Sequence, residues 1–197
     1  MIRAHATREK IVRQAAELFN QQGYAGASMS DVVRVTGLQK GGIYNHFKSK
    51  DELAIAAFDY AAGCFMDCVQ KSVARQRTAI ARLQKLVDNY RQVMRDPPLP
   101  GGCPLLNTAI ESDDTHPALR DRTRAMMAKW LGSMQKIVER GIDKGEIRPE
   151  VEPEAVATAI VAGIEGGVML SKLYADPSYL ERALAHLDEY IVGLSLK

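Results

Sequence analysis

The sequence predicts an all-α protein with a small N-terminal helical domain and a larger C-terminal one. Apolar residues recur three and four positions apart along most of the 197 residues, as they do on the buried face of amphipathic helices. No stretch shows sustained period-two alternation rich in β-branched residues, so strands are not expected. With 46% hydrophobic and 25% charged residues, a chain of this length can bury a core without disulfides or metals.

Three short helices are expected in the first fifty residues. The first spans residues 7–22, with Thr7 as a possible N-cap. The second begins at a capping-box pattern at Ser28 and stops at Gly37, a residue type that often ends helices. A third, short helix follows almost at once and runs through Ile43 to residue 46 or 47.

Five further helices and one short segment, residues 104–110, are expected in the rest of the chain. A second capping box at Ser49 begins the first of them, and Pro153 and Pro177 stand where proline suits the first turn of a helix. Prolines and glycines between residues 97 and 102 interrupt the helical pattern. The expected ranges are Ser49 through Val69, Arg75 to Arg95, Pro104 to Ile110, Pro117 to between Gly141 and Gly145, Pro153 to Ala175, and Pro177 through Leu194.

Charge is distributed unevenly along the chain. Residues 1–50 hold eight Lys and Arg against three Asp and Glu, a balance of +5, whereas the other 147 residues hold 18 and 21, a balance of −3. A basic end on a mildly acidic body suits contact with nucleic acid. A chance fluctuation on a solvated surface gives the same pattern.

Apolar runs and cysteine usage indicate a cytoplasmic protein. The longest apolar run, residues 155–170, is interrupted by Glu165 and falls short of the roughly 20 residues of a membrane span. The N-terminus has no apolar stretch typical of a signal peptide. Three cysteines, an odd number, suggest thiols in a reducing compartment. No membrane partner is expected.

The segment around Gly37 is typical of a helix-turn-helix motif. Gly37 can adopt left-handed backbone angles at the turn, and Leu38 and Ile43 can hold the second helix across the first. The side chains left facing outward suit a DNA major groove, because Gln and Asn pair with adenine, Lys with guanine or phosphate, and Tyr and His reach phosphate. These outward residues are Gln39, Lys40, Gly41, Tyr44, Asn45 and His46.

Residues 8–60 resemble the DNA-binding domain of the tetracycline-repressor (TetR) family of bacterial transcription regulators. The matching stretches are Arg8 to Phe19 with Gly23-Tyr24, Met29 to Gly37, and above all Lys40 to Phe47 with Lys48 to Leu53. Two positions depart from the common pattern: Gln39 stands where the family often has Ser or Thr, and Gly42 where it often has a hydroxyl or alanine. These departures bear on the operator sequence and not on the fold.

The resemblance implies a DNA-binding domain over residues 1–50 and an effector-binding and dimerisation domain over residues 51–197. It implies a homodimer that places two recognition helices on a palindromic operator of double-stranded DNA. The implied contacts are to phosphate from Ser28, Tyr44, His46 and Lys50, and to base edges from Gln39, Lys40, Gly41 and Asn45.

The last two expected helices are candidates for the dimer contact. Gly163, Gly166 and Gly167 fall inside one of them, where glycine weakens a helix, so a closely packed neighbouring helix would account for them. Packing within one subunit is the alternative.

The implied regulator responds to a small-molecule effector. Methionine and aromatic side chains in the C-terminal domain offer an adaptable apolar lining, although such side chains at helical spacing more often form an ordinary core. The candidate pocket residues are Phe65, Tyr90, Met94, Cys103, Asn107, Met126 and Trp130.

Cys103 raises an alternative to a bound effector. The segment Gly101-Gly102-Cys103-Pro104 resembles a glycine-cysteine motif in a branch of the family that includes sensors of electrophiles and oxidants. At the start of a helix the partial positive charge favours the thiolate, and some exposure would make it a sensing thiol. A buried packing role for Cys103, and a DNA-binding protein without any effector, are the other possibilities.

No enzyme, cofactor or metal site is expected. The sequence has no Gly-rich phosphate loop, no nucleophile elbow and no cluster with metal-ligand spacing. Cys64 and Cys68 lie four residues apart without His or acidic partners nearby, which favours a core role. The expected function is a repressor that an effector releases from its operator.

Overall fold

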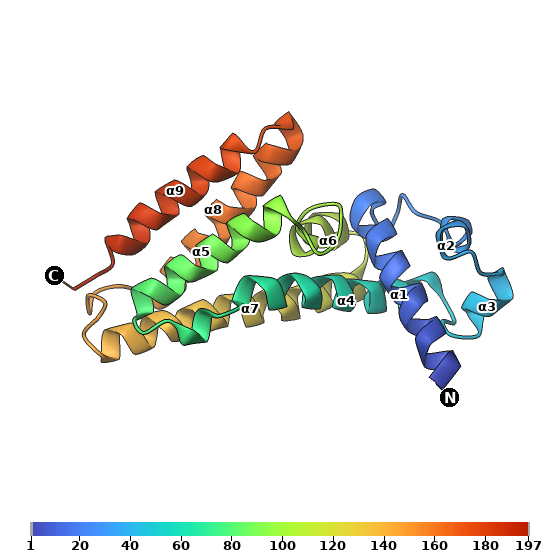
Figure 1. The fold of residues 1–197 in the computed structure, drawn as a ribbon, viewed down its shortest axis with the longest axis horizontal. Coiled ribbons are helices and arrows are strands. Elements are labelled where there is room, and N and C mark those ends of the chain that lie inside the picture. Colours follow the sequence, from blue (N-terminus) through green and yellow to red (C-terminus); the bar gives the residue numbers. More distant parts are fainter. Residues whose placement is uncertain (1, 197) are drawn as a thin grey trace. The chain divides into compact units, whose positions relative to one another are not determined.

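The computed structural model describes residues 2–196, and over this range the chain folds into helices (Figure 1). β pairing within residues 2–196 is limited to an isolated bridge between Ile147 and Ser195. The all-α prediction is therefore confirmed. The helices are α1 (Ile2–Gln22), α2 (Met29–Thr36), α3 (Lys40–Tyr44), α4 (Lys50–Gln70), the 3-10 turn η1 (Val73–Arg75), α5 (Ala79–Arg95), α6 (Pro104–Ser112), α7 (Pro117–Asp143), α8 (Pro153–Tyr174) and α9 (Ser178–Val192).

Two predicted helix starts were wrong. Thr7 is not an N-cap, because α1 already begins at Ile2 and no helix breaker stands between the two. The fifth helix begins at Ala79, four residues later than predicted. There Thr78 Oγ1 accepts a hydrogen bond from Ala81 N at 3.2 Å, which satisfies one of the amides that a helix start leaves without a partner.

Contacts divide the chain into two compact units. The first contains the chain up to Phe65 together with Pro98–Met126, and the second contains Met66–Pro97 together with the chain from Met127 onward. Helices α4 and α7 contribute residues to both units. The sequence predicts a different division, at residue 50, between a DNA-binding and an effector-binding domain. That functional boundary stays a prediction.

The core of the first unit holds α1, α2, α3 and the start of α4 together. Ile43 on α3 and Phe47 just after it are fully buried, so the short α3 is anchored at its C-terminal end. Burial of each such side chain stabilises the fold by about 1.5–3 kcal/mol. The fully buried members of this core are Ile11, Ala15, Val32, Ile43, Phe47, Leu53 and Ala57.

Helix α2 begins at a complete capping box, as the sequence predicts. Ser28 Oγ accepts a hydrogen bond from Asp31 N at 3.2 Å, and Asp31 Oδ2 accepts one from Ser28 N at 2.9 Å. Hydrogen bonds from the Ser28 hydroxyl and amide, and from Arg34, lower the pKa of Asp31 to about 2. The helix ends at Gly37, whose φ of 65° is left-handed.

The chain after α1 is held by α6 and the loop before it. We call Gly101, Asn107 and Glu111 the α6 clamp. The Glu111 carboxylate accepts hydrogen bonds from Tyr24 N at 2.7 Å and Ala25 N at 2.9 Å. The side chain of Glu111 therefore faces the loop that leads into α2.

Two glycines make this close approach possible. A Cβ on Gly101, whose φ is 108°, would lie 2.5 Å from Asn20 O, and a Cβ on Gly23 would lie 2.6 Å from Glu111 Oε1. Asn107 Nδ2 donates to Asn20 O at 3.1 Å and to Gly101 O at 2.9 Å. The end of α1 is thus bonded to α6 through both backbone and side-chain groups.

Tyr24 also bonds the same loop to α4. Its hydroxyl donates to Asp51 Oδ1, and His116 Nε2 lies 3.6 Å from the same oxygen. Lys50 Nζ donates to Tyr24 O and lies 4.1 Å from the centroid of the Tyr24 ring. Burial and the Asp51 carboxylate raise the pKa of Tyr24 to about 12, and the hydrogen bond from Tyr24 lowers the pKa of Asp51.

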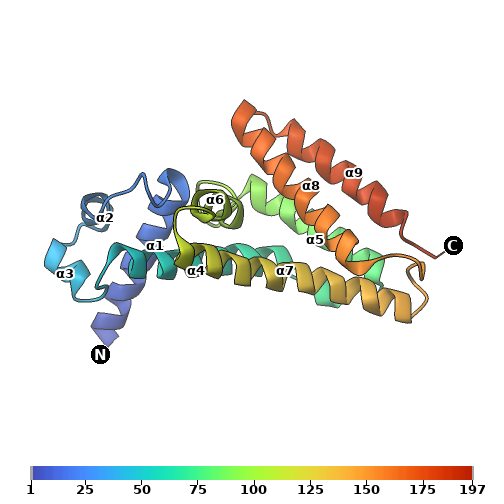
Figure 2. The same ribbon diagram turned by 180° about the vertical axis from the view of Figure 1, so that it is seen from behind.

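In the second unit α9 lies beside both α8 and α5 (Figures 1 and 2). A Cβ on Gly163 would lie 3.2 Å from Leu187, and a Cβ on Gly167 would lie 3.0 Å from Ala183. A Cβ on Gly166 would meet no atom of the described residues within 4 Å. Two of the three glycines therefore serve packing within one chain, which was the alternative to a dimer contact.

Helix α8 is long and apolar. It has 22 residues, and an 18-residue window within it has a mean hydropathy of 1.5, enough by length and composition to cross a membrane. Its buried side includes Ile160, Ile164 and Val168. Because α8 packs along α9, the role of a core helix accounts for this composition.

Replacing Ser28 by alanine is expected to destabilise the protein by about 1 kcal/mol, because the hydroxyl no longer accepts a hydrogen bond from Asp31 N or donates one to Asp31 Oδ2. The measurement is the urea midpoint of unfolding. Ser30→Ala is the matched control, since Ser30 is exposed within the same helix. Equal effects of the two substitutions would contradict the role assigned to the cap.

The lowered pKa of Asp51 predicts a pH-dependent contribution to stability. The contribution is present above the ordinary aspartate pKa of about 3.9 and is lost as the pH falls through the lower, folded-state value. The difference in unfolding free energy between the wild type and Asp51→Asn should therefore shrink below about pH 4. Tyr24→Phe, which removes the donor, should weaken this pH dependence, and a constant difference across the acid range would contradict the assignment.

Candidate functional site

The turn between α2 and α3 is fixed by the buried side chain of Thr36. Its hydroxyl donates to Val32 O at 2.7 Å and accepts from Leu38 N at 3.3 Å. Lys10 on α1 donates to Thr36 O at 2.9 Å. With Ile43 fully buried and Leu38 packed against the same core, the orientation of α3 on α1 and α2 is set.

Helix α3 presents one exposed polar face. It ends at Tyr44, earlier than predicted, because the next residues turn toward the cap of α4. Gln39 makes no capping hydrogen bond with its side chain, and Lys40 Nζ lies 5.8 Å from the centroid of the Tyr44 ring. His46 is half-buried. The exposed residues of this face are Gln39, Lys40, Gly41, Tyr44 and Asn45.

The two glycines of α3 are not required by the packing of the chain. A Cβ on Gly41 or on Gly42 would meet no described atom within 4 Å. Each glycine nevertheless weakens the helix by about 1 kcal/mol relative to alanine. Internal packing therefore gives no reason for glycine at these positions, whereas close approach of another molecule to the backbone of α3 would be one.

Two residues expected at phosphates have partners within the chain. The Ser28 hydroxyl donates to Asp31 Oδ2 at 2.7 Å while it caps α2. Lys50 is half-buried, and its ammonium group is bound to Tyr24. Five of the eight predicted residues are therefore exposed on α3 and the residues that flank it, whereas His46 and Lys50 are half-buried and Ser28 is at the start of α2.

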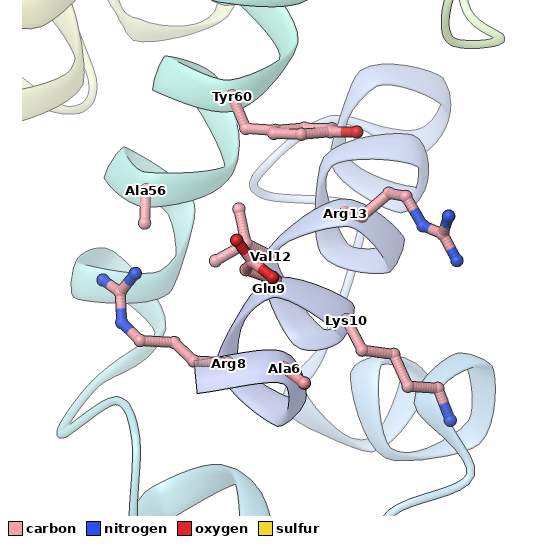
Figure 3. A pocket seen from close by; sticks show the side chains of 8 residues that line it. All are labelled: Ala6, Arg8, Glu9, Lys10, Val12, Arg13, Ala56 and Tyr60. Atoms are coloured by element: carbon pink, nitrogen blue, oxygen red, sulfur yellow. The ribbon is translucent and has the colours of Figure 1, made fainter. Parts of the chain in front are cut away.

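A groove of about 580 Å³ lies between α1 and α4 in the first unit (Figure 3). Arg8, Lys10 and Arg13 line its α1 side, and Tyr60 reaches across it from α4. Arg8 lies 4.9 Å from the centroid of the Phe47 ring, which places a cation beside the end of α3. Arg8 and Arg13 belong to the basic excess of residues 1–50, but no contact was predicted for them.

Two of the predicted effector residues meet in the core of the second unit. The rings of Tyr90 and Trp130 are stacked, with centroids 5.9 Å apart and planes inclined by 9°. The Tyr90 hydroxyl donates to Glu165 Oε1 at 3.1 Å. Glu165 was not among the predicted residues, although a carboxylate inside the apolar run 155–170 was the signal for it.

The other predicted effector residues lie elsewhere. Met94 is half-buried on α5 in the second unit, whereas Phe65, Asn107 and Met126 belong to the first. The Asn107 amide is part of the α6 clamp. Cys103 also belongs to the first unit, and it precedes α6 at the N-cap position and is fully buried.

A smaller cavity of about 160 Å³ lies beside the α6 clamp in the first unit. Among the described residues, its lining includes Tyr24, Glu111, His116 and Leu119 and none of the seven predicted effector residues. Glu111 already binds the loop after α1, and His116 Nδ1 accepts a hydrogen bond from Leu119 N at 3.2 Å. Within residues 2–196, no three His, Cys, Asp or Glu side chains gather in a way that could hold a metal ion.

Residues 11–57 match the family model described as bacterial regulatory proteins of the tetR family, and residues 79–187 match the tetracyclin repressor-like C-terminal domain. The fold is similar to a TetR transcriptional regulator from Chloroflexus aurantiacus J-10-FL, with 46% identity, a TM-score of 0.95, and coverage of 99% of this chain and 98% of that one. It is also similar to a TetR-family regulator from Cytophaga hutchinsonii, with 33% identity, a TM-score of 0.89 and the same coverage.

An uncharacterized HTH-type transcriptional regulator from Lactococcus lactis subsp. lactis is 27% identical over 89% of this chain and 88% of its own length. The two family models together span the helix-turn-helix and most of the remaining helices. The chain therefore belongs to the TetR family of helix-turn-helix transcriptional regulators.

Proposed function

We propose that this regulator is a homodimeric repressor that leaves a palindromic operator when a small-molecule effector binds. The observation that carries the proposal is the face of α3, where polar side chains are exposed next to two glycines that internal packing does not require. Repression by a dimer is typical of the TetR family.

On DNA, the exposed face of α3 enters the major groove. Asn45 and Gln39 pair with adenine edges, and Lys40 binds guanine or phosphate. The Tyr44 hydroxyl donates to a phosphate oxygen. Gly41 lets the backbone of α3 approach the base pairs more closely than any side chain would permit.

Outside α3, the proposal keeps fewer phosphate contacts than the family resemblance implied. Lys50 and Ser28 are held by Tyr24 and Asp31, so either residue must give up an internal hydrogen bond to reach DNA. Arg8 lies beside Phe47 at the end of α3 and replaces Lys50 as the cation proposed to bind the phosphate backbone.

The dimer contact is proposed on the outer side of α8. Ala162, Gly166, Met169 and Leu173 follow one another at helical spacing, and we call them the outer row of α8. Met169 and Leu173 are exposed large apolar side chains, and Gly166 leaves open space where a side chain would stand. A second copy of the chain related by a twofold axis would cover this row and set the spacing of two recognition helices.

Effector binding releases DNA through a two-state equilibrium. The effector must prefer the conformation whose recognition helices are misplaced for the operator, by at least ~1–3 kcal/mol. The alternative is thiol sensing by Cys103, which its position at the start of α6 supports. Sensing thiols are typically solvent-accessible, whereas Cys103 is fully buried, so we favour a bound effector.

Replacing Gly41 by alanine is expected to change stability and DNA affinity in opposite directions. The methyl group meets nothing within the chain and improves helix propensity, so stability should rise by up to about 1 kcal/mol. Operator affinity should fall at least about tenfold, comparable to the loss of one base contact. Fluorescence anisotropy with an operator selected from random duplexes measures the affinity.

The control for this experiment is Gly132→Ala on α7, where a Cβ also meets nothing within 4 Å. It should raise stability without changing operator affinity. If Gly41→Ala binds the operator with unchanged affinity, α3 does not contact DNA in the proposed way.

Replacing Leu173 by aspartate should convert the dimer into a monomer, because a charge would be buried in the proposed contact. The measurement is the mass in solution, which should fall from twice the chain mass of 21.7 kDa to that mass. Ile110→Asp is matched in exposure, 70% against 71% for Leu173, and should stay dimeric. If both variants remain dimeric, the outer row of α8 is not the dimer contact.

A further inference from the structure

Three side chains from separate helices form a polar cluster in the apolar core of the second unit. Tyr90 comes from α5, Trp130 from α7 and Glu165 from α8, and we call them the Glu165 cluster. Tyr90 and Trp130 are fully buried, and Glu165 is 7% exposed. The Tyr90 hydroxyl donates to Glu165 Oε1 at 3.1 Å, and the Tyr90 and Trp130 rings are stacked.

The indole N–H of Trp130 is buried and has no hydrogen-bond acceptor among the described residues. Such groups are rare in folded proteins, and each one destabilises the chain that contains it. A buried carboxylate likewise costs free energy relative to an apolar side chain of the same size. Ile164 and Val168, which are buried close by on α8, show that apolar residues suit this helix.

A ligand accounts for this combination better than core packing does. The indole N–H requires an acceptor atom, and the carboxylate favours a donor with positive charge. The faces of a tyrosine and a tryptophan attract cations as well. A few polar groups converging in apolar surroundings are what specific small-molecule sites consist of.

We propose that the Glu165 cluster recognises a flat organic cation, such as a protonated amidine or amine, that also carries a carbonyl or hydroxyl acceptor. The cation pairs with Glu165, the body lies against the aromatic rings, and the acceptor receives the Trp130 N–H. This inference rests on the proposed effector-binding function and names the chemical class of the effector.

The closed state of the cluster gives the ligand its regulatory effect. Because Tyr90 and Trp130 are fully buried and Glu165 is only 7% exposed, a ligand reaches all three only when the helices that carry them separate. The ligand therefore binds the opened conformation and not the closed one. Such a difference in affinity between two conformations is what an effector needs in order to shift their equilibrium.

The test compares two probes of the same size and shape. 4-Amidinobenzamide carries a cation and a carbonyl acceptor, and benzene-1,4-dicarboxamide replaces the cation with a neutral amide. Trp130 is the only tryptophan of the chain, so its fluorescence reports on this cluster alone. In the full-length wild type, the amidine should change the emission saturably and bind at least about tenfold more tightly than the diamide.

Glu165→Gln should bring the two affinities within about twofold of each other, because the charge is removed and the volume is kept. Glu139→Gln is the control, since Glu139 is an exposed carboxylate on the same helix as Trp130 and its removal should leave the tenfold preference intact. If Glu165→Gln does not fold, the comparison of the two probes in the wild type alone decides.

Equal affinities for the two probes in the wild type, or no saturable change with either, would overturn the cationic class. A preference retained by Glu165→Gln would do the same. Operator binding by the same wild-type preparation without a probe tests the proposed function separately. If the protein does not bind an operator, the proposed function is wrong. If it binds an operator but does not prefer the amidine over the diamide, only this inference is wrong.

Discussion

The first unit depends on one carboxylate, that of Glu111. It accepts hydrogen bonds from the backbone amides of Tyr24 and Ala25, immediately after α1, at distances that leave no room for a side chain on Gly23. Hydrogen bonds to a charged acceptor contribute about 1.5–3 kcal/mol each, with the lower end appropriate where the bond is exposed. Because α1 shares its core with α2 and α3, displacing α6 must either break these bonds or move α1 together with α2 and α3.

Most of the buried polar groups in residues 2–196 have hydrogen-bond partners, and a few do not. Thr36 fills its position at the turn with hydrogen bonds to Val32 and Leu38, and Asn89 donates to Val69 O at 2.8 Å and to Lys71 O at 2.6 Å. These groups are paired because an unpaired one would cost about 1–3 kcal/mol. Within the described residues, the N–H of Trp130 and the Oε1 atom of Gln14 depart from that rule. Such departures are informative because most buried polar groups of folded proteins are paired.

Local sequence signals predicted the elements but not the partners of side chains. The capping box at Ser28 and the left-handed Gly37 follow from residues three to nine positions apart, and both are confirmed. The family resemblance assigned Lys50 to a phosphate contact, yet Tyr24, 26 residues away, binds its ammonium group. The pairing of Glu111 with the loop after α1 spans 87 residues, and no local pattern encodes such a contact.

Glu165 shows the same limit and leads to a physical link between ligand and dimer. It stood out in the sequence only as an interruption of an apolar run, while its contact with Tyr90 required the fold. The next residue, Gly166, belongs to the proposed dimer contact, so one turn of α8 serves both the ligand and the second subunit. A helix packed to the density of a protein interior cannot shift its buried side without carrying its outer side along. On the proposed function, a ligand that opens the Glu165 cluster therefore changes the contact between subunits. That contact sets the spacing of two recognition helices, which should be near a whole number of DNA turns of about 34 Å each.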